Sequence, residues 1–321
     1  MTQKRALIFG ASGQAGRYLS RMLYGMGYQV FGTYYRHTNT EPILTSAICC
    51  DVCIRSDVRA ALVISQPDVI YNFASEMFAP RSWELPVRYT ETNFVSVVHM
   101  LELIQNLCPN ARFFLAGSAE VFDLTQFPQT EKTPIKPRNP YGVAKAAAQD
   151  IIRLYREQKG LFACTGIFYN MESPLRQRSF FSRKVVTEVV RVKLALDKGE
   201  TPEPIKLGKL HAVRDWGYTE EYMEAAYTML HARIPDDYIV STGRCFSCKE
   251  FVDEALEHVG LGWPKTREFL EFEKSDPDEV DRLCGLPLKI DNNLGWKAKK
   301  AMPELVKLMV EEELKQQLVS I

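Results

Sequence analysis

The fold is indicated by one short segment near the N-terminus, Ala6-Leu7-Ile8-Phe9-Gly10-Ala11-Ser12-Gly13-Gln14-Ala15-Gly16. Its first four residues are apolar, which is typical of a strand buried on both faces of a parallel sheet. Three glycines follow, and residues 17–23 then have the periodicity of an amphipathic helix. Glycines here allow a tight turn and close approach to a pyrophosphate, which the helix N-terminus attracts. The segment therefore predicts the first strand, turn and helix of a dinucleotide-binding fold; the alternative is a glycine-rich turn without a ligand. The cofactor contacts expected in it are Gly10, Ser12, Gly13, Gln14 and Gly16.

The second predicted strand, residues 29–35, ends where such folds discriminate between two cofactors. An acidic residue there would accept hydrogen bonds from the ribose hydroxyls of NAD, but this chain has Arg36, followed by His37 and Thr38. A guanidinium can bind the 2′-phosphate of NADP through two hydrogen bonds. We therefore expect NADP as the cofactor, with a solvated surface arginine as the alternative.

Two more strands are predicted at residues 48–52 and 68–74. Asp51 is expected to reach the adenine edge, with Val52 beside it, and Phe73 and Ala74 end the next strand where the cofactor should lie. The apolar helix expected at residues 92–107 suits packing on the sheet or an interface with a second subunit.

A second motif is Pro140-Tyr141-Gly142-Val143-Ala144-Lys145. Asn139 can cap this predicted helix and Pro140 suits its first turn. Tyr141 and Lys145 are four residues apart and therefore lie on one helix face. A nearby ammonium group stabilises a phenolate, so Tyr141 can act as a base towards a sugar hydroxyl. An ordinary exposed helix start is the alternative.

The fifth predicted strand, residues 112–118, ends in Ser118, whose hydroxyl can hold the substrate hydroxyl that Tyr141 deprotonates. The glycine turn, Ser118, Tyr141 and Lys145 occur in the order found in short-chain dehydrogenase/reductases, which this chain resembles. The expected fold is α/β, a Rossmann-type doubly wound parallel sheet, with hydride transfer as the chemistry.

The chain has 321 residues, with 40 basic and 40 acidic side chains. This balance gives no reason to expect nucleic acid or an anionic membrane as a partner. The N-terminal apolar stretch is too short for a signal peptide, so a cytoplasmic protein is expected. Of the 8 cysteines, Cys245 and Cys248 form a single Cys-x-x-Cys without a second ligand pair, so we expect no metal and reduced thiols.

A narrower resemblance extends from about residue 5 to about residue 312. The segments Asn170-Met-Glu172-Ser-Pro174 and Arg214-Asp-Trp-Gly217 are similar to those of the GDP-mannose 4,6-dehydratase family, as is Leu294-Gly-Trp-Lys297. The resemblance implies a homodimer or homotetramer and two interleaved domains: residues 1–172 and 212–244 for NADP, and residues 173–211 and 245–321, a smaller mixed α/β domain, for the nucleotide sugar. Basic side chains in the second domain suit a diphosphate. The substrate-binding residues that it implies are Asn170, Glu172, Arg176, Lys184, Arg214 and Glu279.

The same resemblance assigns Glu120 as the general acid/base of a dehydratase. At a strand end, side chains two residues apart point to one side, so Glu120 should lie beside Ser118. After oxidation at C4, the sugar loses its C5 proton and its C6 hydroxyl, and the stored hydride returns to C6. GDP-mannose would thus become GDP-4-keto-6-deoxymannose.

The chain also departs from the family pattern. Residues 76–79 read Glu-Met-Phe-Ala where the family has Gln-Ser-His-Val, and the arginine that usually precedes Pro277 is replaced by Asp276. Three alternatives therefore stay open: a reductase that uses NADPH on a GDP-4-keto-6-deoxy sugar, a dehydratase for a modified GDP-sugar such as a heptose or an amino sugar, and a non-catalytic cofactor-binding sensor.

Overall fold

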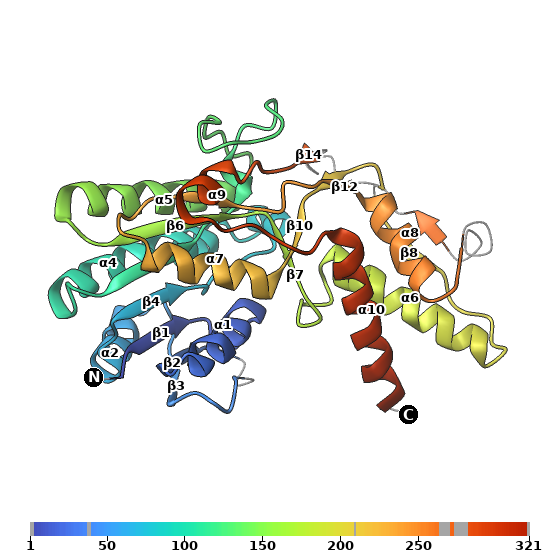
Figure 1. Ribbon diagram of the computed structural model, residues 1–321, viewed down its shortest axis with the longest axis horizontal. Coiled ribbons are helices and arrows are strands. Elements are labelled where there is room, and N and C mark those ends of the chain that lie inside the picture. The colour runs from blue at the N-terminus through green and yellow to red at the C-terminus, as the bar shows by residue number, and fades with distance from the viewer. Residues whose placement is uncertain (1–2, 37–39, 209, 263–269, 273–281, 320–321) are drawn as a thin grey trace. The chain divides into compact units, whose positions relative to one another are not determined.

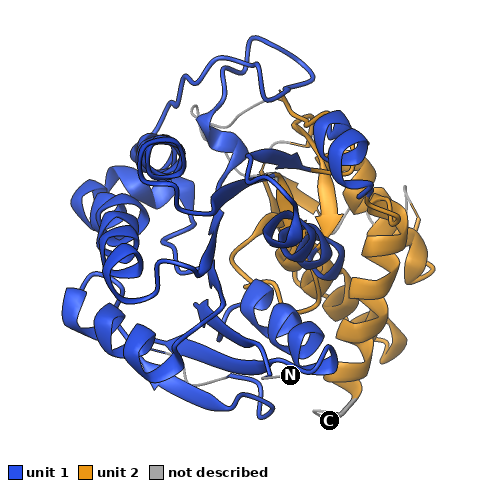
Figure 2. Ribbon diagram, turned by 60° about the vertical axis from the view of Figure 1, so that its left-hand side comes forward, with its two compact units in different colours: residues 1–168, 219–240, 287–297 blue, residues 169–218, 241–286, 298–321 orange. Residues whose placement is uncertain are grey.

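The computed structural model describes residues 3–36, 40–208, 210–262, 270–272 and 282–319. The chain forms two compact units, which Figure 2 shows in different colours. Unit 1 contains residues 1–168, 219–240 and 287–297, and unit 2 contains residues 169–218, 241–286 and 298–321. None of the helices within the described residues has the length and apolar character needed to cross a membrane.

Unit 1 is built on a seven-stranded, wholly parallel sheet in the order β11-β6-β5-β4-β1-β2-β3. The strand order reverses on either side of β1 and β4, as in a doubly wound Rossmann sheet, which confirms the predicted fold class. The strands are β1 (Arg5–Phe9), β2 (Gln29–Tyr34), β3 (Ser46–Cys49), β4 (Val69–Asn72), β5 (Arg112–Ala116), β6 (Ala163–Phe168) and β11 (Tyr238–Val240).

Helices cover both faces of this sheet (Figure 1). One group, α2, α4 and α5, packs together on one face, while α1 and α7 pack together on the other. The helices are α1 (Gln14–Gly25), α2 (Arg55–Ser65), α3 (Pro86–Thr90), α4 (Ser96–Leu107), α5 (Pro140–Lys159), α7 (Thr219–His231) and α9 (Leu288–Leu294). Shorter turns of helix are η1 (Ala79–Trp83), the π-helical η2 (Glu91–Val95) and η3 (Ala119–Val121).

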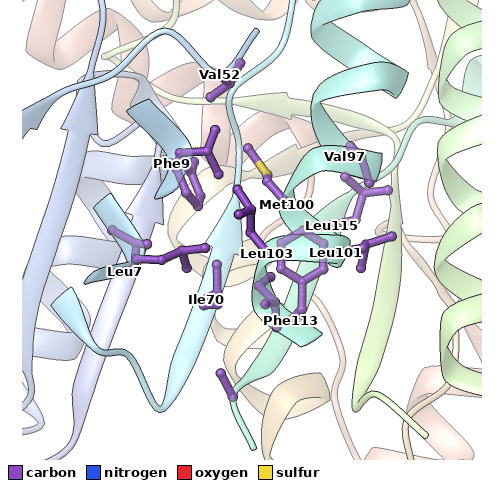
Figure 3. Packing of buried hydrophobic residues seen from close by; sticks show 14 of the residues in the cluster. Leu7, Phe9, Val52, Ile70, Val97, Met100, Leu101, Leu103, Phe113 and Leu115 are labelled. Carbon is purple, nitrogen blue, oxygen red and sulfur yellow. The ribbon is translucent and has the colours of Figure 1, made fainter. Parts of the chain in front are cut away.

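The hydrophobic core of unit 1 lies between the sheet and α4, as Figure 3 shows. Leu7, Ile70 and Phe113 from adjacent strands meet Met100 and Leu101 of α4, and all five side chains are completely buried. The apolar side of the predicted 92–107 helix is therefore used for packing on the sheet. This core holds the carboxyl ends of β1, β4 and β5 in one row, which is where ligands of such sheets bind.

One predicted strand is displaced. β3 ends at Cys49, whereas the sequence predicted a strand over residues 48–52. Asp51 bends the chain, because its carboxylate accepts a hydrogen bond from the backbone N–H of Cys53 (3.0 Å) and its carbonyl accepts one from that of Ile54 (2.9 Å). An aspartate that bonds the backbone two residues ahead favours a turn over an extended strand.

Among the residues that the structure describes, unit 2 has three small sheets and three longer helices. β7 pairs with β10, β9 lies between β12 and β14, and β8 pairs with β13. The strands are β7 (Asn170–Glu172), β8 (Ile205–Leu207), β9 (Val213–Arg214), β10 (Trp216–Tyr218), β12 (Phe246–Ser247), β13 (Leu270–Phe272) and β14 (Arg282–Leu283). The helices α6 (Phe181–Asp197), α8 (Cys248–His258) and α10 (Met302–Val319) pack against one another.

The expectation that all cysteines are reduced thiols is wrong for two of them. Cys245 and Cys284 form a disulfide between the residue before β12 and the residue after β14, the two strands that flank β9. Because those strands both pair with Arg214, the two cysteines are brought within bonding distance although 39 residues separate them. The remaining six cysteines are free.

The two units also differ from the predicted domain boundaries. Residues 287–297, which the sequence analysis assigned to the second domain, belong to unit 1. Here α9 packs beside β11, and the Lys289 ammonium donates to the Asp237 carbonyl (2.9 Å) and pairs with the Asp236 carboxylate (2.7 Å). These contacts join segments more than fifty residues apart in the chain, which local sequence patterns do not reveal.

Candidate active site

The glycine turn between β1 and α1 is tightly packed. Gly10 has a φ of +82°, and a Cβ there would lie 2.9 Å from the backbone nitrogen of Ala74. A Cβ at Gly16 would lie only 2.4 Å from the Gly10 carbonyl oxygen. Only glycine therefore allows α1 to start this close to the strand. Gly13 is the N-cap of α1 and has no side chain that could accept hydrogen bonds from the first backbone N–H groups of the helix.

Those N–H groups and the helix dipole form a site for an anion such as a pyrophosphate. Ser12 is half-buried in the turn and Gly13 is exposed. Gln14 begins the helix, and its side-chain oxygen accepts a hydrogen bond from the Thr219 hydroxyl (3.2 Å). The five predicted glycine-turn residues thus come together at the carboxyl edge of the sheet, in an arrangement that fits a dinucleotide.

At the end of β2, two guanidinium groups lie over one aromatic ring. Arg36 and Arg88 stand 5.1 Å and 5.9 Å from the centre of the Tyr35 ring. Arg88, from α3, also pairs with Asp51 (3.9 Å) and Glu76 (3.4 Å). The end of β2 is therefore brought beside Asp51. Arg36 itself is exposed, as a residue that reads a ligand phosphate must be.

The other predicted cofactor residues lie on the neighbouring strand ends. Val52 and Phe73 are both buried, and the Val52 side chain belongs to the hydrophobic core. The backbone nitrogen of Ala74 donates to the Asn72 side chain (3.1 Å), which fixes the loop after β4. Phe73 and Ala74 are also the backbone against which Gly10 packs.

Ser118 and Glu120 lie just beyond the end of β5. The Ser118 hydroxyl oxygen accepts a hydrogen bond from the backbone N–H of Glu120 (3.2 Å) and so caps the short helix η3. The hydroxyl hydrogen of Ser118 can then be donated to a substrate oxygen. Ser118 is 8% exposed, whereas Glu120 is half-buried and can reach a ligand.

Tyr141 and Lys145 lie one turn apart at the start of α5. The Tyr141 ring packs edge-on against the buried Tyr89 ring, with 6.3 Å between centres. The Lys145 ammonium donates to the carbonyl of Ala116, the last residue of β5 (3.0 Å). Lys145 therefore ties the helix that carries Tyr141 to the strand that precedes Ser118, and the four predicted catalytic residues converge.

Burial sets the charge state of Lys145. Removal from water disfavours the ammonium form and lowers the pKa of Lys145 to about 8. The side chain is still mostly protonated at neutral pH, so it supplies a positive charge with little surrounding water. A charge in such an environment acts more strongly on a neighbouring phenolate than a solvated one does.

In unit 2, two of the predicted substrate residues, Asn170 and Glu172, lie on β7, which pairs with β10. The register places Asn170 opposite Trp216 and Glu172 opposite Tyr218, so the Asn-Met-Glu and Arg-Asp-Trp-Gly segments lie side by side. Glu172 is 2% exposed, and its carboxylate accepts a hydrogen bond from Ser182 (2.5 Å) and pairs with Arg176 (3.3 Å). Burial raises the pKa of the Glu172 carboxyl, an effect that Arg176 and Ser182 oppose.

The basic side chains of unit 2 come from different elements. The Arg176 guanidinium lies 3.5 Å from the centre of the Phe180 ring, Lys184 is in the first turn of α6, and Arg214 is in β9. Asp215, beside Arg214, is completely buried and accepts hydrogen bonds from Thr242 and Gly243. Glu279, like His37 and Thr38, lies outside the described residues.

Sequence reasoning missed the roles of Arg88 and Tyr89. Tyr89 packs on Tyr141 and donates its hydroxyl to the Phe78 carbonyl (2.6 Å). Both residues belong to α3, a five-residue helix without a recognisable motif. Asn139 was predicted as a helix cap but not as a neighbour of Glu120, to which it donates a hydrogen bond (3.3 Å). The described residues contain no group of three or more His, Cys, Asp and Glu side chains that could hold a metal ion.

The parallel sheet, the glycine turn and the Ser118–Tyr141–Lys145 set define a Rossmann-type protein of the short-chain dehydrogenase/reductase class. The profile of the family described as "GDP-mannose 4,6 dehydratase" matches residues 7–309. GDP-mannose 4,6 dehydratase 2 of Arabidopsis thaliana is 35% identical, over 97% of this chain and 87% of its own length. The chain belongs to the GDP-mannose 4,6-dehydratase family, as the resemblance in the sequence implied.

Solved structures share the fold at lower identity. A dTDP-glucose 4,6-dehydratase from Bacillus anthracis, in complex with NAD, superposes with a TM-score of 0.83 and 20% identity, covering 98% of both chains. RMD from Pseudomonas aeruginosa, complexed with NADPH, superposes with a TM-score of 0.81 and 18% identity, covering 98% of this chain and all of its own. At these identities the likeness establishes the fold.

Proposed function

We propose that this chain is an NADP-dependent 4,6-dehydratase that converts GDP-mannose to GDP-4-keto-6-deoxymannose. The observation that carries the proposal is the position of Glu120 beside the helix that bears Tyr141. A plain dehydrogenase or reductase needs Ser118, Tyr141 and Lys145 but has no task for this carboxylate. Family membership over nearly the whole chain supports the same reaction.

The residues divide the reaction between them. Tyr141, with its phenolate stabilised by Lys145, takes the proton of the sugar 4-hydroxyl, while Ser118 donates to the same oxygen. NADP, when bound, accepts the C4 hydride and later returns it to C6. The 4-ketone acidifies the C5 hydrogen, so Glu120 can remove that proton and protonate the C6 hydroxyl, which leaves as water. C5 finally regains a proton from solvent, and Tyr141 releases to solvent the proton that it took from the 4-hydroxyl.

The cofactor residues proposed are the glycine turn, Arg36, Asp51 and the strand ends at Val52, Phe73 and Ala74. The N-terminus of α1, with a glycine as its N-cap, fits a pyrophosphate. The exposed Arg36 guanidinium fits a 2′-phosphate, which favours NADP over NAD.

For the substrate, we propose that Arg176, Lys184 and Arg214 supply positive charge to the diphosphate, with Asn170 and Glu279 as further contacts. Glu172 is proposed to act through Arg176, because its buried carboxylate is already bonded to that guanidinium. A carboxylate in this position fixes the direction of the guanidinium.

We further propose a homodimer or homotetramer. Leu154 and Val143 of α5 are 41% and 55% exposed, and Leu107 at the end of α4 is 41% exposed. Apolar side chains on neighbouring helices suit burial against a second copy. Sedimentation velocity of the purified protein, which reports its mass in solution, tests the assembly.

The reaction is tested by incubation with GDP-mannose and a trace of NADP⁺. Because the hydride returns to the same sugar, we expect many turnovers, a product lighter by one water, and no steady change in nicotinamide absorbance. Stoichiometric loss of added NADPH would select the reductase alternative instead.

Glu120→Gln tests the same proposal at the residue that distinguishes it. The amide keeps the shape but cannot accept the C5 proton, so water loss should slow by about 100-fold or more. Cofactor affinity, measured by fluorescence titration, should stay within about two-fold of wild type, because Glu120 is not in the glycine turn. Unchanged turnover would show that another group is the base.

A further inference from the structure

The Asn139 side chain bonds to two parts of the site at once. Its Oδ1 accepts a hydrogen bond from the backbone N–H of Gly142 (2.8 Å), which caps α5. Its Nδ2 donates to Oε2 of Glu120 (3.3 Å). Because the cap requires the oxygen, the amide nitrogen must face the carboxylate, so the orientation of the amide is determined by its surroundings.

The backbone on either side is also in close contact. A Cβ at Gly142 would lie 2.7 Å from the Glu120 carbonyl oxygen, so the first turn of α5 rests directly on the backbone of Glu120. In addition, the Ser118 hydroxyl oxygen accepts a hydrogen bond from the backbone N–H of Glu120. These contacts position the main chain of Glu120. Its side chain has further rotatable bonds, and Asn139 holds the far end of it.

We propose that Asn139 is a positioning residue that holds the Glu120 carboxylate in the orientation needed to remove the C5 proton. The inference rests on the proposed dehydratase function. With Oε2 bonded to Asn139, Oε1 is left to accept the proton. Asn139 precedes Tyr141 by two residues at the start of the same helix. Because Asn139 also bonds Glu120, the two proton-transfer groups, the Tyr141 hydroxyl and the Glu120 carboxylate, are held at a constant separation.

Asn139→Ser separates this role from helix capping. Serine is as good an N-cap as asparagine but has no amide to reach Glu120. Asn139→Asp also keeps the cap, but it places a second carboxylate beside the first. We expect both variants to oxidise C4 within about two-fold of wild type. Water loss should slow by about 10-fold in the serine variant, the typical effect of losing a hydrogen bond to a charged group, and by more in the aspartate variant.

The expected result is therefore that water loss slows while C4 oxidation does not. In a stopped-flow first turnover with GDP-mannose, reduced nicotinamide should accumulate in both variants and not in wild type. Incorporation of solvent deuterium into C5 of the product should slow in parallel, and this readout follows proton transfer at C5 instead of the absorbance of the nicotinamide. Asn106→Ser, an exposed asparagine on α4, is the matched control and should leave both readouts unchanged.

Three results decide the matter. A wild-type protein that does not dehydrate GDP-mannose or any other GDP-sugar would overturn the proposed function itself. A wild-type protein that does so, with a serine variant equal to it in both readouts, would overturn only the role of Asn139. Equal slowing of C4 oxidation and water loss, together with a lower Tm, would show that Asn139 acts only as a helix cap.

Discussion

The Lys145 ammonium lies 5.8 Å from the centre of the Tyr141 ring, and both side chains are at most 8% exposed. Two functional groups one helical turn apart are thus held together in a region with little water. The Ala116 carbonyl anchors the ammonium and the Tyr89 ring packs against Tyr141, so contacts from outside α5 hold both groups in place.

Tyr141→Phe should stop the first hydride transfer. The ring and its packing against Tyr89 are retained, but the oxygen that accepts the sugar proton is lost. We expect no reduced nicotinamide to appear in a first turnover, in contrast to Glu120→Gln, in which it should form. Tyr155→Phe, on the same helix about four turns further along, is the control. First-turnover reduction at the wild-type rate would show that Tyr141 is not the base.

The buried charge of Lys145 should appear in the pH dependence of stability. Burial lowers the pKa of Lys145 from 10.5 to about 8, so between these values the unfolded chain binds more protons than the folded chain. Stability therefore rises with pH across this window as the penalty for burying the charge is removed. Lys145→Met lacks the titration. Urea unfolding of both proteins at several pH values should show their difference in unfolding free energy changing in favour of wild type as pH rises; a constant difference would contradict the assignment.

Arg36→Ala should weaken NADP more than NAD. Loss of a charge-assisted contact to the 2′-phosphate costs roughly 1.5–3 kcal/mol, or about 10- to 150-fold in Kd. Arg153→Ala removes an equal charge from an exposed site on α5 and should change neither affinity. Isothermal titration with both cofactors measures the ratio. An equal loss for NADP and NAD would show that Arg36 does not read the phosphate.

The sugar preference should be decided near residues 76–79. Asn93 bonds both the backbone N–H and the carbonyl of Glu76, and the Glu76 carboxylate pairs with Arg88. The backbone of this segment is thus fixed while its side chains depart from the family pattern. We expect GDP-mannose to be turned over fastest and a modified GDP-sugar to rank second. An analogue that leaves polar groups of the pocket without a hydrogen-bond partner is rejected strongly.

Comparison of kcat/KM across GDP-sugars measures this preference. If GDP-mannose binds without reacting while another GDP-sugar reacts, residues 76–79 have changed the specificity of the pocket. Preference for a UDP- or TDP-sugar would contradict the nucleotide assignment and leave only the reaction class.

The sequence by itself determined the sheet, the glycine turn and the start of α5. These features depend on local rules: a buried parallel strand must be apolar, a tight strand–helix turn needs glycine, and Tyr-x-x-x-Lys lies on one helix face because of the helical repeat. The order of the motifs along the chain then indicated the family, since Asn170-Met-Glu172-Ser-Pro174 and Arg214-Asp-Trp-Gly217 are much more specific signals than the glycine turn.

Contacts between distant segments were decided only by the tertiary structure. The hydrogen bond from Asn139 to Glu120 spans 19 residues, and the Cys245–Cys284 disulfide spans 39. The end of β3 at Cys49 and the packing of α9 beside β11 likewise depend on partners that local patterns do not specify. Local periodicity sets which face of an element is buried, whereas the side chain it meets there is set by how the whole chain packs, and that is why the support around Glu120 and Tyr141 became visible only in three dimensions.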